Sequence, residues 1–184
     1  MGWGKYVWTA LAASVIAHLA VVHASPRFIM GGAIDRLSKT AGVNTWRASE
    51  RITAASRQIV RPSPDFAYSA CVYDLSRGPV LISTTPWEPY WSLSLYAANT
   101  DNFFVIDDRE ARYGAEITLV RAGRSHPEGA ATVVESPSQR GIALIRRLAP
   151  SPDTYSAAAE VARGDVWASA AQLVGYGSGG CAVG

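Results

Sequence analysis

Histidine, the usual general base of enzymes, occurs only three times in this chain of 184 residues. His18 and His23 lie in or beside an apolar N-terminal stretch, and His126 precedes a proline in a polar, glycine-rich loop. The chain also lacks a GxSxG elbow, an HExxH pair, a cysteine–histidine zinc spacing and a phosphate-binding glycine loop. These absences argue against serine-type and zinc-dependent catalysis, and we expect no catalytic residue, no cofactor and no metal ligand.

Charged residues and cysteines are also few. Charged residues make up 17% of the chain, and a net charge of +2 with a pI near 8.6 is too mild to indicate nucleic-acid binding. In an exported protein the two cysteines, Cys71 and Cys181, could form a disulfide that fixes the C-terminal tail to the body. The alternative is that Cys71 is a small buried hydrophobic residue and Cys181 a free thiol in the tail.

Hydrophobic residues, in contrast, make up 48% of the chain and concentrate at its N-terminus. Tyr6–Val22 contains no Asp, Glu, Lys or Arg, and its 17 residues would rise about 26 Å as a helix, enough for a short membrane span. The sequence Val22-His23-Ala24 also resembles a signal-peptide cleavage site. A retained anchor is favoured by the apolar periodicity that resumes after Pro26 and by three interfacial aromatic residues, Trp3, Tyr6 and Trp8.

Either an anchor or a signal would export the body of the protein. The basic residues Arg27, Arg36 and Lys39 follow the apolar segment and outnumber Lys5 before it, so the positive-inside rule alone favours a cytoplasmic body. Long domains after a signal-like segment nevertheless cross the membrane largely regardless of charge. We therefore expect a single-pass protein of the inner (cytoplasmic) membrane with its globular body in the periplasm, and the lipid bilayer as one partner.

Residues 28–60 are expected to form a helical connector between the membrane and a folded domain. Their apolar residues have helical spacing, which is interrupted at Gly31-Gly32. Asn44 or Thr45 could cap a further helix that begins at Trp46. The resulting division of the chain is a membrane anchor at 1–27, the connector at 28–60, a β domain at 61–164 and a flexible, glycine-rich tail at 165–184.

The β domain is predicted from aromatic and β-branched residues in period-two order, which Pro, Gly, Asn and Asp interrupt at short intervals. In the strand expected from Tyr90 to Tyr96, the residues Trp91, Leu93 and Leu95 share one face, as the core side of a sheet requires. Seven short strands at such spacing predict an antiparallel β-sandwich or jelly-roll-like domain. We expect these strands at 66–75, 80–84, 90–96, 103–106, 115–121, 131–135 and 142–148, followed by a helix at about 153–163.

The same run carries a family resemblance. Pro62–Ser69, the turn Asp74–Pro79, the strand Tyr90-Trp91-Ser92 and the segment Asn99–Phe103 resemble, in this order, the motifs of the domain of unknown function 1254. The resemblance covers about residues 43–163 and implies a β-sandwich in the cell envelope, but no activity, because none is established for the family. More narrowly, the chain is similar to short membrane members from alphaproteobacteria that have a single transmembrane helix.

Two departures from the family pattern affect the expected site. Ser63 and Phe66 replace the usual Asn and Thr of the first motif. The second β domain of the longer members does not follow in this sequence, so we expect no ligand site formed between two domains.

The candidate ligand-binding residues come from the aromatic run. Asp65 opens a strand directly after Arg61-Pro62-Ser63-Pro64, so it could bind either a neighbouring arginine (Arg61, Arg146 or Arg147) or a polar ligand. Trp and Tyr side chains could stack on sugar rings, although in a β domain most of them fill the core. The candidate set is Arg61, Asp65, Tyr68, Trp87, Tyr90 and Trp91.

A second group of acidic residues flanks one expected strand. Such carboxylates could form a glycosidase pair or a calcium site, but Asp in turns commonly bonds its own backbone. The group consists of Asp101, Asp107, Asp108 and Glu110.

A membrane-tethered domain without a catalytic constellation favours binding over catalysis. We expect a binding or assembly module whose partner is another membrane or envelope protein, with a paralogous family member as one candidate. One alternative is a periplasmic protein that binds or hydrolyses glycan with its carboxylates. A second alternative is an accessory structural subunit of a larger membrane complex, whose helix would pack through the small residues Ala10, Ala13, Ser14 and Ala17.

Overall fold

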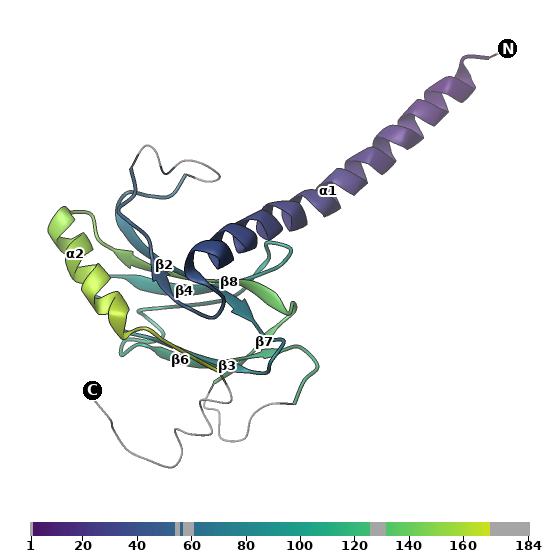
Figure 1. Ribbon diagram of the computed structural model, residues 1–184. Coiled ribbons are helices and arrows are strands. Elements are labelled where there is room, and N and C mark those ends of the chain that lie inside the picture. The colour runs from purple at the N-terminus through teal and green to yellow at the C-terminus, as the bar shows by residue number, and fades with distance from the viewer. Residues whose placement is uncertain (1, 54–55, 57–60, 126–131, 170–184) are drawn as a thin grey trace.

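The computed structural model describes residues 2–53, 56, 61–125 and 132–169, which form two β-sheets, a long N-terminal helix and a short C-terminal helix (Figure 1). The helices are α1 (Gly4–Ala41) and α2 (Pro152–Val161), and a short 3-10 turn, η2 (Ala162–Gly164), follows α2. The strands are β1 (Arg47–Ala48), β2 (Phe66–Asp74), β3 (Val80–Thr84), β4 (Trp91–Ala97), β5 (Asn102–Asp107), β6 (Ala115–Arg121), β7 (Val133–Ser136), β8 (Arg140–Leu148) and β9 (Val166–Ser169). All seven predicted strands are confirmed to within two residues at each end.

The strands are arranged in one sheet of five and one of four. The first sheet has the order β1-β2-β8-β4-β5, and all its neighbouring strands are antiparallel. The second has the order β7-β6-β3-β9, in which β3 is antiparallel to both neighbours but β6 and β7 are parallel. The expectation of purely antiparallel strands is therefore wrong for this pair. Parallel neighbours need a connection longer than a hairpin turn, and residues 122–132 supply it.

One hydrophobic core lies between the two sheets, which pack face to face (Figure 1). As the alternation in β4 predicted, Trp91, Leu93 and Leu95 point into this core, and each is completely buried. The four-stranded sheet contributes branched apolar residues from three of its strands, Val80, Ile82, Ile117, Leu119 and Val134. Burial of side chains of this size stabilises a fold by about 1.5–3 kcal/mol each.

The first half of α1 makes no packing contacts with the rest of the protein. Every residue from Gly4 to Val22 is exposed, and an 18-residue stretch of the helix has a mean hydropathy of 1.7. The helix is therefore long and apolar enough to cross a membrane, so it could be a membrane anchor or a signal sequence.

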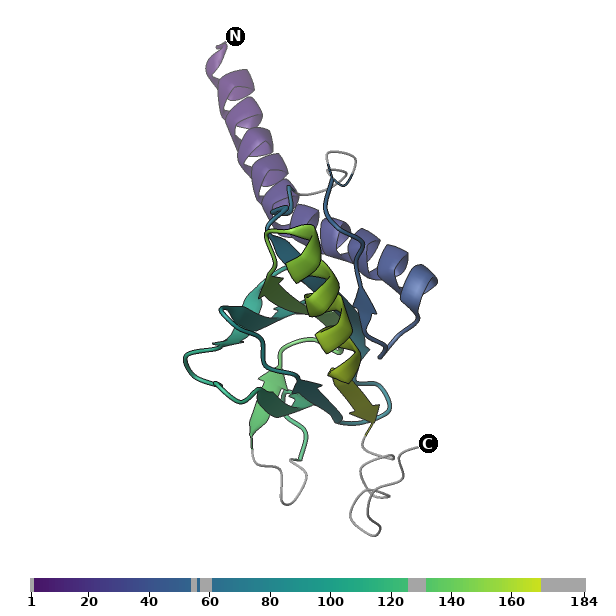
Figure 2. The same cartoon turned by 90° about the vertical axis from the view of Figure 1, so that its left-hand side faces the viewer.

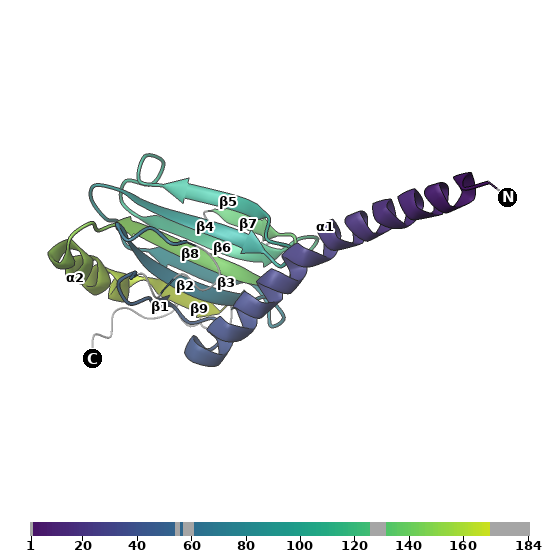
Figure 3. The same ribbon diagram turned by 90° about the horizontal axis from the view of Figure 1, so that it is seen from above.

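The second half of α1 packs on the outer face of the five-stranded sheet, near one of its ends (Figure 3). Met30 and Ile34 are buried against Val72 of β2, and Tyr96 and Ile142 complete the contact. The helix changes direction between its two halves (Figure 2). Pro26 lies inside the helix and has no N–H to donate, which is a common cause of such bends.

The connector between α1 and β2 differs from the expectation. The helix continues through Gly31-Gly32 to Ala41, and no helix begins at Trp46. Arg47 and Ala48 instead form β1 at the edge of the five-stranded sheet, paired with Ala70 and Ser69. These tertiary hydrogen bonds outweigh the helical spacing of the apolar residues.

The C-terminal part of the described chain contains both a confirmed and a missed element. Helix α2 was predicted, and Ser151 caps it by exchanging hydrogen bonds with Thr154 in a capping box. Val166–Ser169, within the segment expected to be a flexible tail, forms strand β9 beside β3. Residues 170–184 of that tail, which include Cys181, lie outside the described residues.

Candidate functional site

The two ends of the two-sheet domain differ. The near end carries the β2–β3, β4–β5 and β7–β8 turns and is the end on which α1 packs (Figure 3). The far end, at the opposite ends of the same strands, carries the segment before β2, the β3–β4 loop, the β5–β6 loop and the end of β8. All six candidate residues of the sequence belong to segments at the far end.

The end of β8 holds three of these segments together through backbone groups. Leu148 N donates to the carbonyl of Tyr90 at 2.9 Å, and Ala149 N donates to the carbonyl of Asp65 at 2.7 Å. The indole Nε1 of Trp87 donates to the carbonyl of Leu148 at 2.8 Å. The structure therefore brings Asp65, Trp87 and Tyr90 to one place, although much of the bonding is between backbone atoms.

The side chains of the candidate set have different environments. Arg61 and Asp65 are exposed, whereas Tyr68 is half-buried and its hydroxyl accepts from the N–H of Ser63 at 3.0 Å. Tyr90 is half-buried, with its ring edge-on to Phe66 at a centroid distance of 5.9 Å. Trp91 is completely buried in the core, so it cannot contact a ligand without unfolding.

Two of the three arginines proposed as partners of Asp65 bond elsewhere. Arg146 donates to Ser94 Oγ at 3.2 Å. Arg147 forms a bidentate ion pair with Asp165, at 2.9 Å from Nη1 to Oδ2 and 2.5 Å from Nη2 to Oδ1. The side chain of Arg147 is 2% exposed and that of Asp165 is 0% exposed. The sequence pointed to a buried Asp–Arg link but not to its acid, because Asp165 lies in a stretch expected to be flexible.

This buried ion pair also fixes the start of the β3–β4 loop. Asp165 Oδ1 accepts from the N–H of Thr85 at 2.9 Å, and Arg147 Nη2 donates to the carbonyl of Thr85 at 2.9 Å. Thr85 directly precedes Pro86–Pro89, the segment that carries Trp87. A charge-assisted network of this kind holds a loop more rigidly than neutral hydrogen bonds do.

A hollow of about 640 Å³ lies at the far end between the β3–β4 and β5–β6 loops. One wall is Pro86–Pro89, and the other consists of Asp108, Arg109, Arg112 and Tyr113. The N–H of Asp108 donates to the carbonyl of Trp91 at 3.2 Å, which ties the second wall to β4. We call this hollow the far-end pocket.

Gly114 allows the two loops to approach each other behind the far-end pocket. Its φ of +94° lies in the region that favours glycine. A Cβ atom at this position would lie 2.4 Å from the carbonyl oxygen of Thr84, which is closer than any side chain can be. The close contact between the loops therefore depends on this glycine.

The lining of the far-end pocket combines both signs of charge with aromatic surface. Glu88 and Asp108 contribute carboxylates, and Arg109 and Arg112 contribute guanidinium groups. Tyr113 is 90% exposed, which leaves its ring free to contact a ligand. Such a lining suits a polar ligand or a peptide segment that carries charges of both signs.

Asp108 stands apart from the other acidic residues of its group. Its Oδ1 is buried and has no hydrogen-bond partner among the described residues. Asp107 Oδ1, in contrast, accepts from the N–H of Arg109 at 3.0 Å, and Asp101 bonds with Asn99, both as expected of Asp in turns. Buried acceptors are rarely left unbonded, which makes Asp108 a candidate ligand contact that the sequence did not distinguish.

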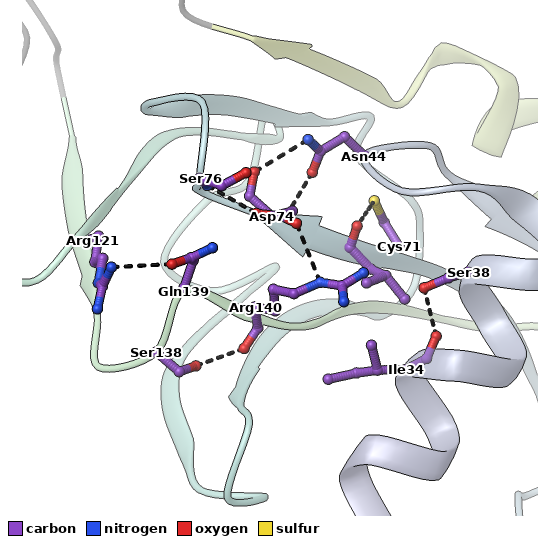
Figure 4. Close-up of polar contacts among 11 residues, drawn as sticks. Ile34, Ser38, Asn44, Cys71, Asp74, Ser76, Arg121, Ser138, Gln139 and Arg140 are labelled. Atoms are coloured by element: carbon purple, nitrogen blue, oxygen red, sulfur yellow. Dashed lines mark hydrogen bonds and ion pairs between the residues drawn. The ribbon is translucent and has the colours of Figure 1, made fainter.

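A separate polar network at the near end has a structural role (Figure 4). Asp74 N donates to Asn44 Oδ1 at 2.8 Å, and the Asp74 carboxylate accepts from Ser76 N at 2.8 Å and pairs with Arg140 at 3.2 Å. Burial alone would raise the pKa of Asp74, but the hydrogen bonds from Ser76 and the charge of Arg140 together hold it below its usual value. The motif Asp74–Pro79 therefore joins the connector, β2 and β8.

Cys71 lies in the core between the sheets and is 1% exposed. Burial raises the pKa of its thiol to about 12, so the thiolate is scarce at neutral pH. Cys181 lies outside the described residues, so the predicted pairing with Cys71 stays a prediction. Over the described part of the chain, no three His, Cys, Asp or Glu residues are grouped so that they could hold a metal ion.

Fold and site together define a two-sheet β domain that is carried on a long apolar N-terminal helix and has a polar pocket at its far end. The chain belongs to the family described as Protein of unknown function (DUF1254), whose model matches residues 43–166. The matched range extends from just after the end of α1 to the first residue of β9. No curated protein matches the chain.

Two bacterial proteins are among the solved structures that are similar to this chain. The VPA0106 protein of Vibrio parahaemolyticus is 15% identical with a TM-score of 0.58, and the match covers 84% of this chain and 39% of that protein. An uncharacterised protein from Burkholderia cenocepacia is 15% identical with a TM-score of 0.44, and the match covers 63% and 35% of the two chains. The chain thus spans about two fifths of the Vibrio protein, and this likeness supports the fold alone.

Proposed function

We propose that this protein is a membrane-anchored binding module of the cell envelope, in which α1 is retained and the far-end pocket holds a segment of another envelope protein in the periplasm. In this proposal, the protein is one of the short, single-helix alphaproteobacterial members of its family. Its two-sheet domain acts as a β-sandwich scaffold. The domain binds and positions a partner and does not transform it.

The relation between α1 and the domain supports a retained anchor. The cleavage-like sequence Val22-His23-Ala24 lies inside the continuous helix, not in an extended segment. The helical residues that follow, Met30 and Ile34, are packed on the sheet. Because α1 continues as one helix, bent near Pro26, from the apolar half into this packed half, the domain is joined directly to the segment that would span the membrane.

The observation that carries the binding proposal is the far-end pocket itself. It is open, it lies at the end opposite to α1, and it contains Asp108 with a buried oxygen that has no described partner. Its two guanidinium groups and two carboxylates offer hydrogen-bonding partners to both charges of a peptide. A pocket that faces away from the anchor can reach proteins in the periplasm or on the outer side of the envelope.

A glycan ligand is the second candidate, and one observation favours it. Glu88 and Asp108 line the same hollow as Trp87 and Tyr113, and carboxylates beside aromatic rings are typical of sugar sites. The half-buried Trp87 has its indole N–H engaged with Leu148, which leaves Tyr113 as the main stacking surface. We favour the protein partner because Arg109 and Arg112 add positive charge to a pocket that also carries carboxylates, and a peptide can present charges of both signs.

Site-specific photocrosslinking in native membranes tests the binding proposal. A photoreactive amino acid replaces Tyr113 at the pocket, and in a control it replaces Asn102, an exposed residue at the near end. We expect a discrete protein adduct from position 113 and none from position 102, and we expect Asp108→Asn to weaken the adduct about tenfold.

Three other results would contradict the proposal in different ways. Adducts to glycan alone would support the second candidate, which titration of soluble glycan fragments would then examine. Equal adducts from both positions would indicate random collision. Crosslinks only from α1 positions such as Ala13 would instead support the accessory-subunit alternative.

A further inference from the structure

The near end of the domain has a basic hollow of its own, separate from the far-end pocket. Its volume is about 390 Å³, and it lies between the β2–β3 turn and the residues that follow β6. Arg77, Arg121 and Arg124 line it, and all three are exposed. No Asp or Glu belongs to its described lining, which is completed by Ser76, Ser125, Gln139 and apolar or backbone groups.

One of these arginines is held in place by the fold. Arg121 Nη1 donates to Gln139 Oε1 at 3.1 Å (Figure 4). Leu75 N donates to the carbonyl of Gln139 at 2.9 Å. The β7–β8 turn therefore fixes Arg121 beside the β2–β3 turn that carries Arg77. Three cations from two segments, the β2–β3 turn and the end of β6, converge on one hollow, which is more than a solvated charged strip requires.

The basic hollow lies at the end of the domain from which the first half of α1 extends. A groove of about 430 Å³ between α1 and the domain is lined by Arg27 and Gly31 of the helix and by Asn99 and Ser138 of the neighbouring turns. Ser138 is next to Gln139, which lines the basic hollow. Figures 1 and 3 show the first half of α1 extending outward from this same end.

The position of Arg27 sets the level of these turns relative to the bilayer. Arg27 follows Val22, the last residue of the apolar run, by five positions, which is a rise of about 7–8 Å along a helix. The headgroup layer on each side of the hydrocarbon core is about 5–8 Å thick. The turns beside Arg27 thus lie at the level of the lipid headgroups if α1 spans the membrane.

We propose that the hollow of Arg77, Arg121 and Arg124 binds the phosphate-bearing headgroup of an anionic phospholipid in the bilayer that α1 crosses, so that the near end docks on the membrane. This inference rests on the retained anchor of the proposed function. Guanidinium groups bind phosphate oxygens bidentately, and each basic residue near an anionic surface strengthens binding about fivefold. Docking would fix the domain's orientation and direct the far-end pocket away from the lipid.

The test uses the full chain, purified from membranes and placed in lipid nanodiscs. The substitution Ser125→Cys introduces an attachment site for an environment-sensitive fluorophore in the hollow, in a Cys181→Ser background, and the buried Cys71 stays unlabelled. We expect a blue shift of the emission, and protection from an aqueous quencher, as phosphatidylglycerol replaces phosphatidylcholine. A second label at Tyr113→Cys, at the far end, should not respond.

Two charge-matched variants examine the role of the hollow. Removal of two of its arginines in Arg77→Gln/Arg124→Gln should weaken the response about 25-fold, which abolishes it over the accessible range of lipid composition. Arg51→Gln/Arg163→Gln removes the same charge from exposed positions away from the near end and outside the far-end pocket, and should keep the full response.

Each contrary result has a distinct meaning. A labelled protein that elutes with the discs but does not respond to anionic lipid would overturn headgroup binding and leave the anchor intact. A response to added inorganic phosphate in discs without anionic lipid would overturn the lipid assignment, as would equal responses of the two double variants. Protein that does not elute with the discs at all would overturn the retained anchor and, with it, this inference.

Discussion

Replacement of Asp165 by asparagine should markedly lower the temperature at which the protein unfolds. Asparagine has the same shape and keeps an acceptor for the N–H of Thr85, but it leaves the guanidinium of Arg147 buried without a counter-charge. Removal of one partner of a buried ion pair costs about 3–5 kcal/mol. For a chain of 184 residues this corresponds to a decrease in Tm of about 6–20 °C.

Thermal unfolding of the full chain in detergent, followed by near-ultraviolet circular dichroism of its tryptophans, measures this effect. The exposed pair of Glu160 and Arg163, with 66% and 76% of the side chains exposed, provides the control. Glu160→Gln should change the stability by only about 0–1 kcal/mol. The double variant Arg147→Met/Asp165→Asn should recover much of the loss, because it removes the unpaired charge.

The same substitution should also affect the far-end pocket, because Thr85 is held by both members of the pair and leads into Pro86–Pro89. We expect weaker crosslinking from position 113 at temperatures where Asp165→Asn is still folded. A Tm within about 2 °C of the Glu160→Gln control would refute the reasoning that this ion pair holds the loop.

Three further predictions concern other parts of the fold. Gly141→Ala should lower the free energy of unfolding by about 1–3 kcal/mol in a urea titration, since its Cβ would lie 2.1 Å from the carbonyl oxygen of Tyr96, and an unchanged midpoint would contradict this packing. Ile34→Ala should destabilise the folded protein by about 2 kcal/mol or more through loss of its contact with Val72, whereas Ile16→Ala, in the exposed half of α1, should not. Because the pKa of Asp74 is lowered on folding, its contribution to stability is present above about pH 4 and is lost as the pH falls through the folded-state pKa. The free energies of unfolding of wild type and Asp74→Asn should therefore differ at neutral pH and converge in acid. A difference that stays constant with pH would exclude this assignment.

The period-two pattern was sufficient to place the seven predicted strands and the inward face of β4, because burial of one face leaves little choice of register. The two short strands were missed for a related reason. Arg47–Ala48 and Val166–Ser169 are edge strands whose partners, β2 and β3, provide the hydrogen bonds, so their own residues carry little alternation. A two- or four-residue edge strand is a property of the sheet more than of its own sequence.

The candidate site was predicted in part. The aromatic run pointed to the segment Pro86–Pro89, which forms one wall of the far-end pocket, but the second wall comes from Asp108–Tyr113, which has the composition of an ordinary turn. Trp91 was included in the ligand set because aromatic residues serve both cores and sugar sites, and only its complete burial distinguishes the two. Asp165 was missed because it lies outside any predicted element and its partner, Arg147, is 18 positions earlier in β8.

The account depends most on the retention of α1, and the mass of the protein extracted from native membranes tests this directly. Intact-mass measurement, supported by peptides that cover Gly4–Arg27, should find the apolar half of α1 still joined to the domain in the membrane fraction. A membrane-free protein whose N-terminus follows Ala24 would contradict the account, since neither the tether nor the headgroup contact could then exist.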